Sequence, residues 1–307
     1  MLCGNYILSN RSEWTFYFLL SVQFNFTISV KYFIDQNKLQ VTVNELQEVY
    51  IPLVQYILLC VQNKKMFSKL KTNYIKSADL NQPFILGITG SVAAGKSTTA
   101  KVIEALISQF YSDLDIQSLT TDGFIYPNKV LEQKNLMSRK GFPDSYNTSL
   151  LNNFLSQVSN GAEDVSYPVY SHELSDIVPG KYRSITNPDI LILEGINILQ
   201  IPVNEKKIIS DYIDLSIYID ADESLLEEWF LTRFKCLLDI NKDNPNNFFY
   251  HWAHIPLDES IDYAKKVWRT VNLVNLRDYI APTKERANII LYKDVGHRVT
   301  SIKIRKY

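Results

Sequence analysis

The amino-acid sequence predicts an α/β fold in which helices flank a mostly parallel sheet, with an added helical region at the N-terminus. The first observation is a glycine-rich loop at 90–97, which follows the apolar run 84–89 and precedes a helical pattern. The second is a series of short apolar runs that alternate with helical patterns after this loop, as in proteins with parallel sheets. The third is a polar stretch at 71–82, which divides the chain into a mainly helical region (1–82) and a core (83–307).

The predicted elements follow from the spacing of apolar residues. Residues 46–59 have helical spacing, and Pro52 is expected either to kink this helix or to start a second turn. Four apolar runs after the loop are predicted strands, at 116–119, 190–193, 215–219 and 288–291. Further helices are predicted at 97–110, 222–237 and 258–279. The helix 222–237 places five apolar residues on one face: Leu225, Leu226, Trp229, Phe230 and Phe234.

Residues 14–30 are rich in aromatic and β-branched types, which raises the question of a membrane-spanning helix. Gln23, Asn25 and Thr27 interrupt the run, and it is shorter than the roughly 20 apolar residues that a spanning helix requires. We therefore expect this segment in the core or at an interface, with no membrane association. The net charge of -1, from 32 basic and 33 acidic residues, provides no electrostatic surface for nucleic acid.

The three cysteines, Cys3, Cys60 and Cys236, are far apart and lack the spacing of metal ligands. We expect neither a disulfide nor a zinc site. Buried thiols suit a reducing compartment, and the predicted location is the cytoplasm.

The glycine-rich loop has the pattern G-x-x-x-x-G-K-[ST]. It consists of Gly90, Ser91, Val92, Ala93, Ala94, Gly95, Lys96 and Ser97, followed by Thr98. In such a P-loop, backbone N–H groups surround nucleotide phosphates, the lysine binds the outer phosphates, and the hydroxyl binds magnesium. The following helix presents its positive N-terminus to the same anion. The loop therefore predicts a P-loop NTPase-type fold that binds ATP and Mg²⁺, rather than an ordinary turn between a strand and a helix.

Ligands of open parallel sheets bind at the carboxyl ends of the strands, so residues that follow each strand are candidates for chemistry. Asp122 follows the strand 116–119, which we expect beside the P-loop strand, and it is our candidate base for an acceptor hydroxyl. The alternative is a helix or turn cap. Glu194 follows the strand 190–193 and, with Ser97, is a candidate magnesium ligand; the alternative is a solvated carboxylate.

Five further side chains could contact substrates. Arg233 lies on a partly apolar helix surface, where its guanidinium suits a transferring phosphoryl group, although such arginines more often form ion pairs. Tyr170 and His172 could bond a small polar substrate, although a lone histidine more often has a structural role. Asn272 and Asn275 lie one turn apart, so we expect both amides to point the same way, toward a substrate amide or toward a cap.

Together these segments resemble the type I, or bacterial, pantothenate kinases, and the similarity covers about residue 39 to the C-terminus. Long motifs carry the resemblance. They are Gly90 to Ala100; Thr120-Thr121-Asp122-Gly123-Phe124 followed by Pro127-Asn128; Lys140-Gly141-Phe142-Pro143 with Ser145-Tyr146; Pro168-Val169-Tyr170-Ser171-His172; Pro188-Asp189-Ile190-Leu191-Ile192-Leu193-Glu194-Gly195; and Pro282-Thr283 with Glu285-Arg286-Ala287.

The resemblance implies ATP-dependent phosphorylation of the primary hydroxyl of pantothenate to 4'-phosphopantothenate, the first step of coenzyme A biosynthesis. By matching position, it implies that Lys96 and Ser97 hold phosphate and magnesium. It implies catalytic roles for Asp122, which would activate the hydroxyl, and Arg233, which would stabilise the transferring charge. Contacts to pantothenate are implied for Tyr170, His172 and Asn272, and a position near the nucleotide base for His297. A homodimer is also implied, which we expect through the long P-loop helix.

Several positions depart from the family pattern. Lys101 and Leu237 stand where an arginine and a phenylalanine are usual, and both positions resemble ones that bind coenzyme A in feedback inhibition. We therefore expect that inhibition to be altered. Phe230 and Phe248 replace tyrosines near the substrate pocket and remove two hydroxyls, which predicts a shifted affinity for pantothenate. Residues 35–40 lack the family's usual acidic pattern near the nucleotide base.

Three other functions compete with this interpretation. One is a related P-loop kinase that acts on uridine or another small hydroxyl substrate. Another is a paralogue without catalysis that binds nucleotide or coenzyme A, which the presence of Lys96, Asp122 and Arg233 disfavours. The last is a GTPase-like switch, which lacks support because no N-K-x-D or D-x-x-G pattern occurs; the nearest is the stretch 241–244.

Overall fold

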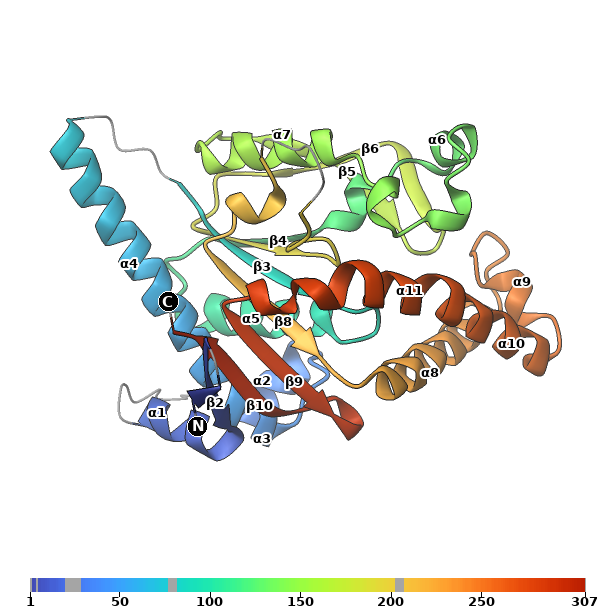
Figure 1. The fold of residues 1–307 in the computed structure, drawn as a ribbon, viewed down its shortest axis with the longest axis horizontal. Coiled ribbons are helices and arrows are strands. Elements are labelled where there is room, and N and C mark those ends of the chain that lie inside the picture. Colours follow the sequence, from blue (N-terminus) through green and yellow to red (C-terminus); the bar gives the residue numbers. More distant parts are fainter. Residues whose placement is uncertain (1, 4, 20–28, 77–81, 202–206, 307) are drawn as a thin grey trace.

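The fold is an α/β arrangement around an eight-stranded sheet, as predicted (Figure 1). A computed structural model describes residues 2–3, 5–19, 29–76, 82–201 and 207–306. Across the sheet the strands are β1 (Leu2–Cys3), β2 (Tyr6–Asn10), β10 (Arg298–Arg305), β9 (Ile289–Asp294), β8 (Leu215–Asp220), β3 (Phe84–Gly90), β7 (Ile190–Glu194) and β4 (Ile116–Thr120). A separate two-stranded sheet pairs β5 (Val165–Ser171) with β6 (Asp176–Ile185).

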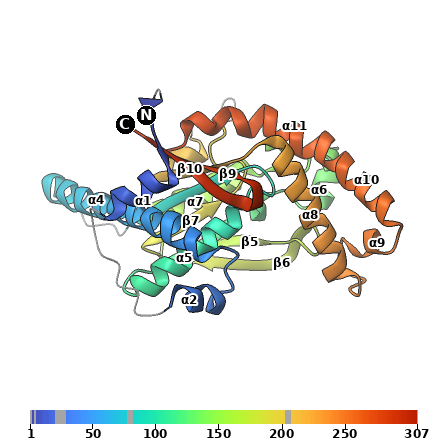
Figure 2. The same ribbon diagram turned by 90° about the horizontal axis from the view of Figure 1, so that it is seen from below.

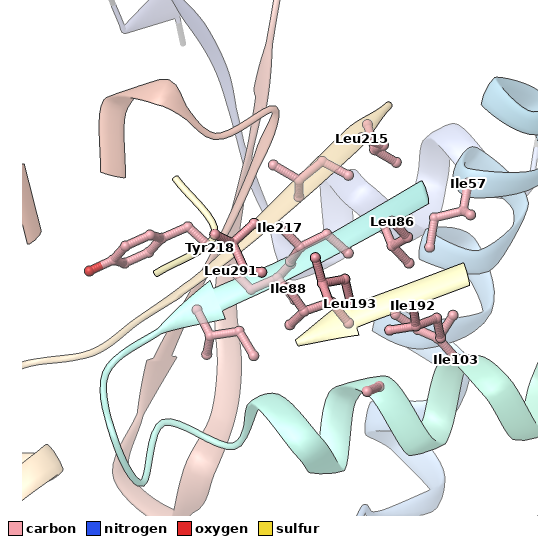
Figure 3. Close-up of a cluster of buried hydrophobic side chains, with 14 of the residues drawn as sticks. Ile57, Leu86, Ile88, Ile103, Ile192, Leu193, Leu215, Ile217, Tyr218 and Leu291 are labelled. Atoms are coloured by element: carbon pink, nitrogen blue, oxygen red, sulfur yellow. The ribbon is translucent and has the colours of Figure 1, made fainter. Parts of the chain in front are cut away.

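Five strands, from β9 to β4 in that order, run parallel to one another. All four strands predicted after the P-loop lie in this parallel block. Their apolar runs are explained by burial, since the central strands β3, β8 and β7 are covered on both faces. Figure 3 shows side chains from these strands meeting Ile57 of α4 and Ile103 of α5 in one apolar cluster.

The position of β4 corrects one prediction. We expected the strand that precedes Asp122 to lie beside the P-loop strand β3, but β7 lies between them. The burial of the two strands explains the order. Residues 190–193 are fully buried in β7, whereas Gln117 and Ser118 make β4 only half-buried, as suits the edge of the sheet.

The helices predicted at 97–110, 222–237 and 258–279 agree closely with the structure, whereas the helix predicted at 46–59 continues to Ile75. The α-helices of the structure are α1 (Arg11–Leu19), α2 (Val30–Gln36), α3 (Val43–Glu45), α4 (Ile51–Ile75), α5 (Lys96–Phe110), α6 (Asn128–Gln133), α7 (Thr148–Ser159), α8 (Glu223–Asn241), α9 (Tyr250–Ala253), α10 (Leu257–Val267) and α11 (Leu273–Asn275). Pro52 lies in the first turn of α4, and the π-helical turn η1 (Leu46–Tyr50) precedes it. Proline cannot donate the backbone hydrogen bond that an unbroken α-helix would need there.

The N-terminal region is mainly helical, but it also extends the sheet. Strand β2 pairs antiparallel with β10, and β1 pairs with β2. Trp14 is buried, as expected for the aromatic segment, and its indole N–H donates to the Val49 carbonyl at 3.2 Å. The rest of that prediction falls partly on residues 20–28, which lie outside the described residues. The hydrophobic core runs continuously from Tyr6 and Trp14 into the sheet, and the division at residue 82 stays a prediction.

Two parts project from the body of the molecule. The C-terminal half of α4 extends to one side, and the group of α8, α9 and α10 extends to the opposite side (Figures 1 and 2). A second, smaller apolar cluster joins these last three helices around Phe234, Leu238 and Ala264. Among the described residues, we find no helix with the length and apolar character needed to span a bilayer.

Of the two cysteines whose side chains the structure describes, Cys60 is half-buried, and burial raises the pKa of its thiol. Cys236 is exposed on α8, which corrects the expectation that the thiols are buried. It occupies the solvent side of a helix whose apolar face supplies the packing.

Candidate active site

The P-loop joins β3 to α5 through a turn that requires glycine at both ends. Gly90 has φ +136°, and a Cβ placed there would lie 2.4 Å from the Ile219 carbonyl oxygen. Gly95 has φ +90°, and a Cβ there would lie 2.7 Å from Lys293 Nζ. A side chain at either position would therefore be strained by the backbone conformation, and at Gly90 it would also collide with backbone, so glycine is required at both ends of the turn.

Lys96 is the first residue of α5, and its side chain folds back over the loop. Its Nζ donates to the Ser91 carbonyl at 2.8 Å. Burial lowers the pKa of the Lys96 ammonium to about 8, and the nearby carboxylates of Glu194 and Asp122 act in the opposite direction. The ammonium is therefore a desolvated cation beside two carboxylates, which is a state that an incoming polyphosphate would stabilise.

Ser97 and Glu194 meet at the next position. The Ser97 hydroxyl donates to Glu194 Oε1 at 2.9 Å, which brings together the two predicted metal ligands. Burial raises the pKa of Glu194, although the Ser97 hydroxyl and the Lys96 ammonium favour its ionised form. Its other oxygen, Oε2, is buried and has no hydrogen-bond partner in the part of the chain that the structure describes. An unpartnered carboxylate oxygen beside a serine hydroxyl fits a Mg²⁺ ion.

Asp122 lies in the 3₁₀ turn η2 (Thr121–Phe124) directly after β4. Thr120, and not Asp122, caps this turn: its hydroxyl accepts from the Asp122 N–H at 3.3 Å. The Thr121 hydroxyl donates to Asn197 Oδ1 at 2.8 Å, which ties the turn to the loop after β7. The carboxylate of Asp122 is half-buried and influences the pKa of both Lys96 and Glu194. The alternative, in which the Asp122 side chain caps this turn, therefore does not describe the structure.

Tyr170 and His172 lie near Asp122 at the end of β5. The Tyr170 ring is half-buried, and burial raises the pKa of its phenol, with Asp122 among the charges that act on it. The phenol lies 3.4 Å from Ser175 Oγ. His172 is exposed and meets the Tyr170 ring edge-on, with ring centroids 5.2 Å apart. Both rings are thus available to a ligand at this edge of the sheet.

Arg233 is exposed on α8, which corrects the expectation that an apolar surface surrounds its guanidinium. The apolar residues that suggested such a surface are themselves buried: Trp229, one turn before Arg233, and Phe234, the residue after it. Its charge nevertheless acts on Lys96 and on Glu194, so the guanidinium lies on the side of α8 that faces the P-loop.

The two asparagines of the last long helix differ, although we expected them to act alike. This helix continues from α10 through the π-helical turns η6 (Trp268–Asn272) and η7 (Leu276–Ile280), so its side chains do not follow regular α-helical spacing. Asn275 is buried, and its amide donates to the Gly141 carbonyl at 2.7 Å. Asn272 is half-buried at the end of η6, and within the described part of the chain its side-chain amide makes no hydrogen bond.

His297 lies in the turn between β9 and β10 with φ +60°. Its ring stacks on Trp229 of α8, with centroids 3.8 Å apart and planes at 25°. Burial lowers the pKa of the imidazole, and the Lys293 ammonium adds to this effect. A neutral, stacked and outward-facing imidazole offers a flat surface to a planar group.

Two lysines at the site were not predicted. Lys293, from β9, is 2% exposed beside Gly95, and burial lowers its pKa to about 8. Lys140 lies with its ammonium 5.5 Å from the centre of the Tyr170 ring, and burial lowers its pKa while Asp176 and Asp122 raise it. For Lys293 the sequence does hold a signal, which is a lysine at an inward position of the apolar strand 289–294. Only the fold, however, shows that this side chain reaches the P-loop.

A pocket of about 310 Å³ opens beside the Ser97 and Glu194 pair. It runs between α5 and the β5–β6 sheet. Its polar lining includes Lys101 and Glu104 from α5 and Arg183 from β6. The site therefore continues beyond the P-loop into a cavity with two basic side chains at its walls.

Comparison with known proteins places the chain among kinases. Residues 85–235 match the model of the phosphoribulokinase / uridine kinase family. The chain is 45% identical over 268 residues to a pantothenate kinase of Levilactobacillus brevis, across 87% of each protein. It is 41% identical over 306 residues to a pantothenate kinase of Ligilactobacillus salivarius, across 99% of this chain and 98% of the relative. Its fold is similar to that of D-glycerate 3-kinase from Cryptococcus neoformans, with a TM-score of 0.57 and 12% identity over 82% of this chain and 99% of that one.

Proposed function

The chain belongs to the pantothenate kinase family, and we propose that it transfers the terminal phosphoryl group of ATP to the primary hydroxyl of pantothenate. The product is 4'-phosphopantothenate, and the reaction is the first step of coenzyme A biosynthesis. The observation that carries this proposal is the meeting of the Asp122 carboxylate, the Lys96 ammonium and the Ser97–Glu194 pair at one edge of the sheet.

In the proposed mechanism, Asp122 orients the pantothenate hydroxyl and takes its proton as the phosphoryl group transfers. Phosphoryl transfer depends mainly on positioning and on neutralising charge, and these side chains supply both. The P-loop N–H groups and Lys96 would bind the phosphates of ATP. The exposed Arg233 would contact the transferring group, since its charge already acts on Lys96 and Glu194.

We propose Ser97 and Glu194 as the protein ligands of Mg²⁺. Among the described residues, no three carboxylate, imidazole or thiol groups form a metal-binding cluster. Two protein ligands completed by nucleotide oxygens and water are, however, the usual arrangement for Mg²⁺ in kinases. When bound, the metal would neutralise charge on the outer phosphates of ATP. Glu194 Oε2, which is buried without a hydrogen-bond partner among the described residues, would be the free ligand atom.

The remaining site residues would hold the two substrates. Tyr170, His172 and Asn272 would lie on the acceptor side, where the half-buried Tyr170 ring, the exposed His172 ring and the Asn272 amide could bond the polar groups of pantothenate. His297 would stack against the adenine base, because its ring is already held flat by Trp229.

We propose that coenzyme A inhibits by occupying the P-loop and the adjoining pocket. A pyrophosphate bound at Ser97 would bring a further phosphate group toward Lys101 and Arg183, which line that pocket. Lys101 gives one point charge in place of a bidentate guanidinium, so the inhibition is expected to be weaker than with arginine at this position.

We propose a homodimer that forms through α4, and not through the P-loop helix α5. The apolar residues of α5 are buried in the core, among them Val102, Ile103 and Leu106. Helix α4 instead exposes a row of large apolar side chains at helical spacing, which are Leu59 and, on its projecting half, Met66, Phe67, Leu70 and Tyr74. A row of this kind on a projecting helix is typical of a protein interface.

We also propose that the enzyme works in the cytoplasm, where its exposed Cys236 stays reduced.

Replacement of Leu70 by glutamate is expected to convert the dimer to a monomer, because it would place two unpaired carboxylates in an apolar interface. Light scattering coupled to size-exclusion chromatography measures the mass. The matched control is Leu257→Glu on α10, because both leucines are 60% exposed. A dimer that survives Leu70→Glu, or that dissociates equally with Leu257→Glu, would contradict the α4 interface.

The proposed reaction is tested with purified protein, MgATP and pantothenate, with the product identified by mass spectrometry. A parallel sample with EDTA is expected to lose turnover, and one with coenzyme A is expected to raise the apparent KM for ATP. Nucleotide binding without any phosphorylated product would favour the paralogue that lacks catalysis.

A further inference from the structure

The turn that joins β5 to β6 lies next to the proposed pantothenate contacts. β5 ends at Ser171 and β6 begins at Asp176, so the turn consists of residues 172–175. The first three residues of the turn are exposed, whereas Ser175 is half-buried, and its hydroxyl lies 3.4 Å from the hydroxyl of Tyr170. Exposed side chains cannot fix a turn by packing, so contacts from other segments must determine where Ser175 holds the Tyr170 phenol.

Asn128, the first residue of α6, bonds to this part of the chain with both its backbone and its side chain. Its backbone N–H donates to Asp176 Oδ1 at 2.9 Å, and its side-chain amide donates to the Ser175 carbonyl at 3.3 Å. The first N–H groups of a helix have no partner within it, so Asp176 also satisfies the start of α6. The half-buried Asn128 therefore joins α6 to the beginning of β6 and to the residue that contacts Tyr170.

Lys140 links Asn128 to the same turn. Its ammonium donates to the Asn128 side-chain oxygen at 2.8 Å and to the Ser175 carbonyl, and it lies 3.4 Å from Ser175 Oγ. The ammonium also lies over the Tyr170 ring, 5.5 Å from its centre. An ammonium only donates hydrogen bonds, so the oxygens of Asn128 and Ser175 determine where this cation lies. Asn128, Lys140 and Ser175 thus form one hydrogen-bonded group beside the Tyr170 phenol.

A bond from another part of the molecule reaches the same turn. The Phe248 N–H donates to the Glu173 carbonyl at 2.7 Å, and Phe248 lies between α8 and α9, in the group of helices that projects from the body (Figures 1 and 2). The turn therefore keeps its contacts to Phe248 and to Lys140 when the side chain of Asn128 is removed. We expect such a variant to fold, with Ser175 displaced rather than released.

We propose that Asn128 is a positioning residue for the acceptor substrate, whose side-chain amide holds Ser175 so that the Tyr170 phenol faces pantothenate. The inference rests on the proposed kinase function and adds a residue to it. Asn128 acts through Ser175 and needs no contact with either substrate. Phosphate binding is assigned to the P-loop and proton transfer to Asp122. Loss of the Asn128 amide should therefore weaken pantothenate binding and leave ATP binding and the chemical step nearly unchanged.

The test compares wild type, Asn128→Ala, Tyr170→Phe and the double variant, all as full-length protein. Asn128→Ala is expected to raise KM for pantothenate by about 10-fold, because the loss of one hydrogen bond typically has an effect of this size. Its kcat and its KM for ATP should change by less than about threefold. If Asn128 acts through Tyr170, the double variant should have the pantothenate KM of Tyr170→Phe within about threefold, because the hydroxyl that Asn128 positions is already absent.

Asn128→Asp separates the two bonds of the side chain. Ionised aspartate has the same shape and keeps an oxygen that accepts from Lys140, but it cannot donate to the Ser175 carbonyl. We therefore expect KM for pantothenate to rise at least as much as in Asn128→Ala. Because this variant keeps the shape of the side chain, it also keeps the test possible if Asn128→Ala is too unstable to assay.

Asn152→Ala is the matched control. Asn152 is a half-buried asparagine of α7, and its side-chain amide also donates to a carbonyl of a distant segment, that of Lys207 at 3.0 Å. The variant loses an equivalent bond, but one between α7 and the segment before the 3₁₀ turn η5 (Ile209–Asp211), neither of which carries a proposed site residue. We expect a small change in Tm, with kcat and both KM values unchanged.

Four results would overturn the inference. The first is an unchanged KM for pantothenate in Asn128→Ala or in Asn128→Asp. The second is a fall in kcat, or a rise in KM for ATP, as large as the rise in KM for pantothenate. The others are a double variant whose KM shows the full product of the two single effects, and an equal rise in Asn152→Ala. A wild-type chain that does not phosphorylate pantothenate would instead overturn the proposed function, and it would be seen before any variant is compared.

Discussion

Replacement of Asp122 by asparagine is expected to lower kcat for pantothenate phosphorylation by about 10²- to 10⁴-fold, the range typical for loss of a general base. Asparagine has the same shape and keeps the backbone N–H that Thr120 caps, so the η2 turn should be preserved. The substitution removes the group that can accept a proton. It also removes one negative charge beside Lys96 and Glu194. The effect should therefore fall on the chemical step, with ATP affinity retained.

Single-turnover rates and ATP binding by calorimetry separate these two quantities. Asp144→Asn is the matched control, since Asp144 is exposed and pairs with Arg139 on the surface. We expect the control to change neither rate nor affinity. Near-normal turnover by a folded Asp122→Asn protein would show that the carboxylate has no part in accepting the proton.

Replacement of Lys96 by methionine is expected to lower kcat/KM for ATP by about 10²- to 10³-fold, which is the effect of removing one preorganised charge from a transition state. The ammonium is desolvated, as its pKa of about 8 indicates, so its attraction for phosphate is not weakened by bulk water. Methionine fills similar space, but it leaves the Glu194 and Asp122 carboxylates uncompensated and without a cation between them and the nucleotide.

Both ATP affinity and kcat should fall in this variant, in contrast to Asp122→Asn, where only the rate falls. Fluorescent-nucleotide binding and steady-state assays measure the two effects. Lys265→Met, which removes a half-buried lysine of α10 that pairs with Asp262 at 3.9 Å, serves as the control. A Lys96→Met enzyme with unchanged ATP affinity and rate would show that the P-loop lysine does not hold the phosphates here.

The sequence was most informative where burial and local geometry agree. The P-loop glycines could be predicted because only glycine tolerates the backbone at Gly90 and Gly95. The central strands could be predicted because a strand covered on both faces reads as an unbroken apolar run. Glu194 stands where such a run ends, and it lies beside Ser97 as expected, while its role as a metal ligand stays a prediction.

The remaining features depend on contacts between distant parts of the chain. The order of the strands across the sheet does not follow their order along the sequence. The position of β7 between β3 and β4 could therefore be predicted only by comparing how polar the strands are. The pairing of Tyr6–Asn10 with β10 joins the two ends of the chain, and nothing local signals it. Lys293 reaches Gly95 from another strand. The π-helical turns around Asn272 and Asn275 changed which way the two amides point, because α-helical spacing was assumed.

The most direct test of the central claim is the ratio of kcat/KM for pantothenate to that for uridine, measured with MgATP and one preparation of the wild-type chain. Both substrates present a primary hydroxyl, but only pantothenate carries an open-chain amide and a carboxylate, the groups that Tyr170, His172 and Asn272 are proposed to bind. A site built to bond such groups should favour pantothenate by about 10⁴-fold or more. Equal rates on the two substrates, or turnover of uridine alone, would contradict the account.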